Sequence, residues 1–138
     1  MFSSETAVSV RYAETDAMAI VHHANYIVWF EQGRTDFFEW LGYPYPEIES
    51  QGFLLPVLDV QANYIKSFRY GDKALIKTSL VEYNRLRMTF KYEIFNNQNE
   101  LCVKGNTTHV MVKKSNFHPV NLSKTHPELH DTFMKALM

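Results

Sequence analysis

The sequence contains one cysteine, Cys102, and only five glycines and five prolines in 138 residues. A single cysteine excludes disulfides within the chain and cysteine-rich zinc sites, and it is typical of a reducing compartment. The formal net charge of -1 gives no basic field for nucleic acid or an anionic membrane surface. No stretch reaches the ~20 apolar residues of a membrane span, and the N-terminal segment lacks an export signal. We therefore predict a cytoplasmic protein with no nucleic acid partner and no membrane span.

The length is typical of a single domain, and we predict that residues 1–138 form one. Aromatic residues make up 14% of the chain, which indicates an aromatic core or an aromatic partner surface. No repeat, low-complexity segment or linker interrupts the pattern. His126 and His130 have the i,i+4 spacing of a ligand pair, but two histidines do not complete a site, so no metal is expected.

Hydrophobic periodicity predicts an α+β architecture. Apolar side chains recur at helical spacing from Ala24 to Leu41, and Gly42 supplies the stop. Gly33 costs about 1 kcal/mol relative to alanine in mid-helix, so we expect the helix backbone to approach its neighbour closely there. Strands are predicted at residues 8–12, 58–64, 73–83, 87–94 and 101–113, with a loop at 43–56, a bulge at Gly105 and a short helix after Pro127.

One helix is too narrow for the sheet that this pattern predicts. A helix is about 10 Å wide, whereas five strands span roughly 24 Å. Apolar sheet surface would therefore stay uncovered in a monomer. An apolar edge strand pairing with its copy would remedy this, so we predict a homo-oligomer.

Two carboxylates, Glu14 and Asp16, precede the only long predicted helix. The first turn of a helix offers free backbone amides and about half a positive charge. A carboxylate beside such amides provides a base or nucleophile together with donors for a developing oxyanion. Simple helix capping is the alternative, although Asp16 lies too far ahead of Ala24 for it. On an extended loop Glu14 would point the same way as Asp16, and we interpret it as a solvated acid or a partner of Arg11.

The run Tyr12-Ala13-Glu14-Thr15-Asp16, followed by Val21-His22-His23-Ala24-Asn25-Tyr26, closely resembles the signature of the 4-hydroxybenzoyl-CoA thioesterase family of hotdog proteins. That family includes the Tol-Pal-associated acyl-CoA thioesterases. Residues 64–72 and 85–92 look like its second-strand and fourth-strand segments. The resemblance implies a hotdog fold, in which a five-stranded antiparallel sheet wraps a long central helix. It also implies a homodimer or homotetramer with its sites between subunits.

The same resemblance implies hydrolysis of a small or medium acyl-CoA to free acid and coenzyme A. Asp16 would be the nucleophile or the general base, and the backbone amide of His23 would polarise the thioester carbonyl. Coenzyme A belongs to the substrate, so no separate cofactor is expected. Relatives hold the phosphates of coenzyme A near the start of the fourth strand, which points to Arg85 and Arg87. Lys66 is a further cation for this role.

Many relatives carry glycine two or three positions after the aspartate, where this chain has Met18 and Ala19. The geometry of that loop and the shape of the acyl pocket are therefore open at this point. Two other functions compete. A non-catalytic module that binds acyl-CoA or acyl-carrier protein would use the same cleft, and a hydratase would need an Asp-His pair acting on the acyl chain. The sequence leaves open aromatic, short and long acyl groups, covalent or base catalysis, and dimer or tetramer.

Overall fold

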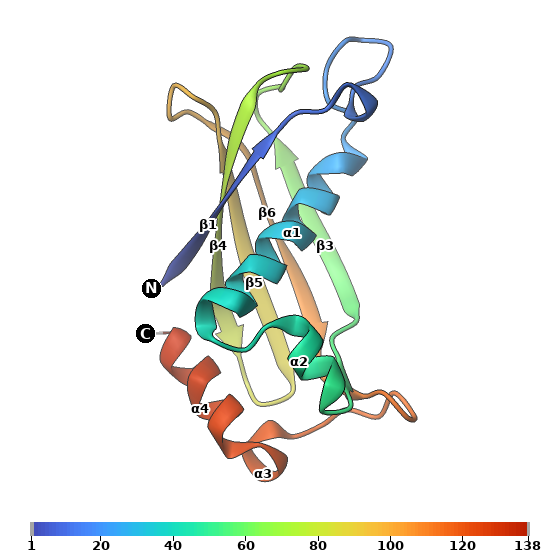
Figure 1. The fold of residues 1–138 in the computed structure, drawn as a ribbon, viewed down its shortest axis with the longest axis vertical. Helices are drawn as coiled ribbons and strands as arrows, with labels where there is room; N and C mark the ends of the chain where they lie inside the picture. The colour runs from blue at the N-terminus through green and yellow to red at the C-terminus, as the bar shows by residue number, and fades with distance from the viewer. Residues whose placement is uncertain (1, 138) are drawn as a thin grey trace.

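One long helix and one antiparallel sheet form most of the molecule (Figure 1). The structure is a computed structural model that describes residues 2–137. In chain order the elements are β1 (Ser3–Ser9), a 3-10 turn (Tyr12–Glu14), α1 (Ala24–Leu41), α2 (Tyr45–Ser50), β2 (Phe53–Leu54), β3 (Val57–Tyr64), β4 (Lys73–Tyr83), β5 (Arg87–Phe95), β6 (Leu101–Val110), β7 (Val112–Lys113), α3 (Leu122–Thr125) and α4 (Pro127–Ala136). Within residues 2–137, none of the helices has the length and apolar character that a membrane crossing requires.

The main sheet has five strands in the order β1-β4-β5-β6-β3, and every neighbouring pair is antiparallel. α1 lies along one face of this sheet (Figure 1). β1 and β3 form its two edges, and β2 pairs with β7 in a separate two-stranded ribbon. The α+β class and the hotdog arrangement expected from the sequence are therefore confirmed.

Aromatic side chains fill the space between α1 and the sheet. Phe30 on α1 stacks on Tyr92 of β5 with ring centroids 4.5 Å apart. Phe37 and Phe38, about two turns further along α1, each meet Phe90 edge to face with ring centroids 5.7 Å apart. All five side chains are fully buried. The high aromatic content of the sequence thus belongs to the core, where large rings bury much apolar area each.

Gly33 in α1 and Gly105 in β6 lie where the backbone is in close contact with neighbouring side chains or strands. A Cβ at Gly33 would lie 2.5 Å from Thr78 Oγ1, which confirms the close contact expected at mid-helix. Gly105 is not a bulge, so that expectation was wrong. It pairs in register with Ala62 and Tyr92, and a Cβ there would come within 2.8 Å of the Phe30 ring. Gly105 is required by packing against α1 and not by strand irregularity.

The predicted boundaries match the structure at both ends for α1 and β4 and differ from it elsewhere. α1 and β4 have the predicted limits, and a helix does follow Pro127. The first strand was placed too late, because β1 pairs with β4 through Ser3 to Ser9 and the chain then closes a 3-10 turn. The predicted loop at 43–56 contains α2 and β2. The last predicted strand is split into β6 and β7, and α3 was not predicted.

Replacing Gly33 with alanine should destabilise the fold, because the added methyl group would meet Thr78 Oγ1 at 2.5 Å and Ile76 at 3.0 Å. We expect the free energy of unfolding to fall by about 1 to 2 kcal/mol despite the better helix propensity of alanine. Urea unfolding measures this change. Gln32→Ala on the exposed face of the same helix is the matched control. Equal stability of Gly33→Ala and the wild type would contradict the close approach.

Candidate functional site

The segment between the 3-10 turn and α1 is a tight loop closed by its own backbone. Asp16 donates its amide hydrogen to the Ile20 carbonyl, and its own carbonyl accepts from Ala19, both at 2.9 Å. Thr15 and Val21 form an isolated β-bridge at the base of the loop. Val21 in turn donates to the Phe68 carbonyl at 2.9 Å, which attaches the loop to the chain ahead of β4. The position of Asp16 is therefore fixed by hydrogen bonds on both sides.

Ala19 has a left-handed backbone conformation, which glycine adopts more readily than alanine does. Its φ is +64°, in the left-handed region, where a Cβ costs about 1 to 2 kcal/mol. The Met18 amide donates to Asp16 Oδ1 at 2.9 Å, and the Met18 side chain is exposed. The loop turn is therefore retained without glycine, and the extra side chain at position 18 borders the pocket described below.

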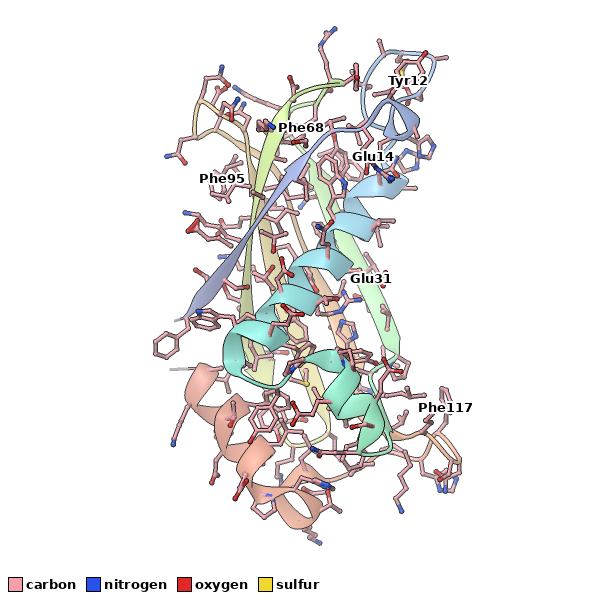
Figure 2. The ribbon with its side chains drawn as sticks, viewed as in Figure 1. Tyr12, Glu14, Glu31, Phe68, Phe95 and Phe117 are labelled. Carbon is pink, nitrogen blue, oxygen red and sulfur yellow. The ribbon has the colours of Figure 1, made fainter. Side chains whose placement is uncertain are left out.

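Glu14 is buried and serves as the anchor of this loop. Its carboxylate accepts from the Arg11 amide at 2.8 Å and from the Trp29 indole at 2.9 Å, and Arg11 Nε lies 3.6 Å away. Figure 2 shows Glu14 beside the first turn of α1. Burial alone would raise the pKa of Glu14, but the hydrogen bonds and the charge of Arg11 outweigh it and lower the pKa. A solvated Glu14 was the wrong interpretation, whereas its pairing with Arg11 is confirmed.

The backbone of Glu14 also sets the start of α1. Its carbonyl accepts from the His22 amide at 2.8 Å and from the Asn25 side chain at 2.9 Å. Ala24 donates to the His22 ring at 3.2 Å, so the neighbouring amides of His22 and Ala24 are both used. The amide of His23 lies between them and donates no hydrogen bond within residues 2–137. An unused amide at the start of an α-helix is a ready donor for a developing negative charge.

Asp16 and His23 line the same open pocket of about 200 Å³. Lys66, two residues after the end of β3, also lines this pocket. The remaining lining is mostly apolar or aromatic and consists of Met18, Ile20, Val21, Tyr26, Tyr64, Ile65 and Ser67. A carboxylate, a backbone amide and an apolar lining in one pocket are the components that an attack on a carbonyl requires. Val21 and Tyr26 belong to the sequence motif and Tyr64, Ile65 and Ser67 to the 64–72 segment, but neither pattern predicts that these residues meet in one pocket.

Lys66 is held at the pocket by an ion pair. Its ammonium group pairs with Glu100, and this hydrogen bond raises the pKa of Lys66 and lowers the pKa of Glu100. The backbone amides of Ile65 and Lys66 both donate to the Cys102 carbonyl, at 2.7 and 3.0 Å. Lys66 therefore has a fixed backbone and a charged head at the rim of the pocket.

Arg85 and Arg87 lie at the other end of the sheet. Arg87 pairs with Val110 on β6, whereas Lys66 is joined to Cys102 on the same strand. Eight positions along a strand correspond to about 26 Å at ~3.3 Å per residue. Within one chain the structure brings together Asp16, His23 and Lys66, but it does not bring Arg85 and Arg87 to the same pocket.

Comparison with known proteins identifies several relatives. The model of the Thioesterase-like superfamily matches residues 10–134. YneP of Bacillus subtilis, a proposed acyl-CoA thioesterase, is 40% identical over 136 residues, which cover 99% of each chain. A solved structure of DHNA-CoA thioesterase from Staphylococcus aureus has a TM-score of 0.94 and 41% identity, covering 98% of this chain and 91% of that one. The acyl-CoA thioester hydrolase YbgC of Escherichia coli is 25% identical over 118 residues, 86% of this chain and 88% of its own.

Glu14→Gln should destabilise the fold at neutral pH, because glutamine lacks the charge and turns an NH2 group toward one of the two N–H donors. We expect a loss of about 2 kcal/mol, as for a hydrogen bond to a buried charged group. The lowered pKa of Glu14 means that its carboxylate stabilises the fold above pH 4.5, and that this contribution is lost as the pH falls through the lowered folded-state pKa. Urea unfolding at pH 7 and pH 3 tests this, since the gap between wild type and variant should narrow in acid. Glu39→Gln on the exposed face of α1 is the control, and a gap independent of pH would contradict the assignment.

Proposed function

This chain belongs to the Thioesterase-like superfamily, and we propose that it hydrolyses an acyl-CoA thioester to free acid and coenzyme A with Asp16 as its catalytic carboxylate. The observation that carries the proposal is the shared pocket of Asp16 and the unused His23 amide. The names of the relatives support the thioester hydrolase class. Coenzyme A enters as part of the substrate, so the proposed reaction needs no resident cofactor.

In the proposed reaction Asp16 acts on water or on the thioester itself. As general base, its carboxylate takes a proton from water while the oxygen bonds to the carbonyl carbon. The electron pair of the C=O bond moves to the oxygen, which accepts the His23 N–H. When that electron pair returns to re-form the carbonyl, the C–S bond breaks and the coenzyme A thiolate leaves with the C–S bonding pair. Asp16 then releases its proton to the thiolate or to solvent. As nucleophile, Asp16 would attack the thioester carbon and displace the coenzyme A thiolate, which leaves a mixed anhydride that water opens at the Asp16 carboxyl carbon. After a single turnover in H2¹⁸O, label in Asp16 would establish this covalent route, because base catalysis puts the label only into the released acid.

The pocket supports a small or medium acyl group. Its volume of about 200 Å³ is modest, and Tyr26 and Tyr64 form an aromatic wall with ring centroids 5.5 Å apart. The Staphylococcus aureus relative is a DHNA-CoA thioesterase. We therefore propose an aromatic acyl group as the first to be tested, with DHNA-CoA in the substrate panel.

The position of the cations supports a site shared between subunits. Arg85 and Arg87 do not line the Asp16 pocket, and about 26 Å along β6 separates the levels of Arg87 and Lys66, so we propose that a second subunit supplies the arginines. β3 is an edge strand that is exposed along nearly its whole length and carries Val57, Leu58 and Val60. Such an edge favours pairing with a second copy. The proposed enzyme is a homodimer or homotetramer, and a cytoplasmic location stays a prediction.

Asp16→Asn should abolish most turnover while leaving the loop folded. Asparagine retains the oxygen that accepts the Met18 amide, but it neither takes a proton nor attacks a carbonyl well. We expect kcat to fall by about 10² to 10⁴-fold, as for loss of a general base. Free thiol release from a panel of aromatic, short-chain and medium-chain acyl-CoAs measures this, with Asp131→Asn on the exposed side of α4 as the control. Wild-type turnover in a folded Asp16→Asn protein would reject the role of Asp16, and binding without hydrolysis of any substrate would favour the non-catalytic module.

A mixing experiment tests the shared site. Asp16→Asn and the double variant Arg85→Ala/Arg87→Ala should each be impaired alone, whereas their mixture should regain activity after co-refolding. Random pairing makes half of the dimers mixed, each with one intact site, so roughly a quarter of wild-type activity should return. Each variant refolded with itself is the control. No regain in mixtures that sedimentation shows to be oligomeric would contradict a site built from two subunits.

A further inference from the structure

A second pocket lies at the end of the molecule opposite to Asp16. It is an open pocket, and its lining residues come from the β2–β7 ribbon and the residues next to it and from the junction of α3 and α4. Figure 1 shows α3 and α4 at the end of the molecule away from the start of α1. Its volume is about 560 Å³, and its lining consists of Gln51, Gly52, Phe53, Lys113, Lys114, Ser115, Val120, Thr125 and His126. None of these residues lines the Asp16 pocket. The helix α1, about 27 Å long at ~1.5 Å per residue, runs between the two ends of the molecule at which the pockets lie.

The lining of this second pocket combines an apolar wall with unneutralised positive charge. Phe53 and Val120 are buried and supply the apolar part. Lys113 and Lys114 form no ion pair within residues 2–137, and no acidic side chain lines the pocket. A ligand that fits must therefore bring an apolar body and a negative charge of its own.

His126 adds a polar group that the protein leaves unused. Its Nδ1 is buried and has no hydrogen-bond partner within residues 2–137. The ring itself is held edge to face against Phe53 with centroids 4.6 Å apart, so it is not turned toward solvent to satisfy that atom. Buried polar atoms are normally paired, because an unpaired one costs about 1 to 3 kcal/mol. Because this nitrogen is fully buried, the His126 ring forms part of the wall, and the accessible positive charges of the pocket are those of Lys113 and Lys114.

The backbone around the lysines is fixed and does not depend on a ligand. The Lys114 amide donates to the Gly52 carbonyl at 2.8 Å, and the Lys113 amide donates to the His118 carbonyl at 3.0 Å. Lys113 is also paired in register with Phe53 across the ribbon. The two charges thus start from a rigid support directly beside the apolar wall, and such preorganisation lowers the entropic cost of binding.

We propose that this second pocket is a binding site for an apolar monocarboxylic acid, with its carboxylate at Lys113 and Lys114 and its hydrocarbon or aromatic body against Phe53, Val120 and the His126 ring. One carboxylate matches the small basic cluster, and the volume is in the range of pockets that take small organic molecules. The choice of acid rests on the proposed function, which releases acids of this class. The existence of the site rests only on the pocket lining.

Titration with octanoate, followed by amide NMR, tests the site in the full-length protein. We expect saturable shifts at Gly52, Ser115 and His126 that are separate from any shifts at Asp16 and His23. The double variant Lys113→Ala/Lys114→Ala should weaken binding at this site at least 10-fold. The variant Lys124→Ala/Lys135→Ala, which removes the same charge from exposed positions on α3 and α4, should bind as the wild type does. Octanamide, which has the same body without the charge, should bind at least 10-fold more weakly than octanoate.

Three outcomes would overturn the proposal: shifts confined to the Asp16 pocket, no saturation, or equal affinity in the two double variants. If the Lys113/Lys114 double variant fails to fold, Lys113→Gln and Lys114→Gln taken singly carry the same comparison. The same proteins are assayed for acyl-CoA hydrolysis. Octanoate binding without hydrolysis rejects the proposed function and keeps this site, whereas hydrolysis without octanoate binding at Gly52 and Ser115 does the reverse.

Discussion

The buried carboxylate of Glu14 is the interaction on which the candidate site depends. It joins three parts of the chain: the Arg11 backbone before the 3-10 turn, the turn itself and Trp29 in the second turn of α1. A buried charge is tolerated only when it is paired and hydrogen-bonded, so these partners are coupled to each other. The Glu14 carbonyl adds bonds to His22 and Asn25. Because these bonds use the amide of His22 but not that of His23, the same constraint that fixes the helix start also leaves one donor available.

The two neighbouring acids of this segment have opposite environments. Glu14 is turned into the core, where donors lower its pKa and keep it charged. Asp16, two residues later, lines an open pocket beside the unused amide. The 3-10 turn at Tyr12–Glu14 separates them, because an extended strand would have placed both side chains on one side. One carboxylate thus maintains the structure and leaves the other for the proposed chemistry.

The sequence predicted the features that depend on the local spacing of apolar residues and on the glycines that end or precede an element. The limits of α1 follow from apolar spacing and from Gly42, and those of β4 follow from the turn at Gly71 and alternation up to Tyr83. Elements such as α2, β2 and β7 are too short to show a period, so they were missed. The role of Glu14 depends on Trp29, fifteen residues away, and the separation of Arg87 from Lys66 depends on strand register. Neither relation is visible in local spacing, because both arise only when distant segments pair.

The uncovered edge of the sheet and the candidate site lie next to each other. β3 has exposed side chains on both faces, and its last residue, Tyr64, together with Ile65 and Lys66, forms one wall of the Asp16 pocket. A second subunit placed along this edge would cover apolar surface that costs free energy when exposed to water. It would also lie directly beside the open wall of the pocket. In the proposed enzyme, assembly and the completion of the site are therefore two results of the same apolar edge.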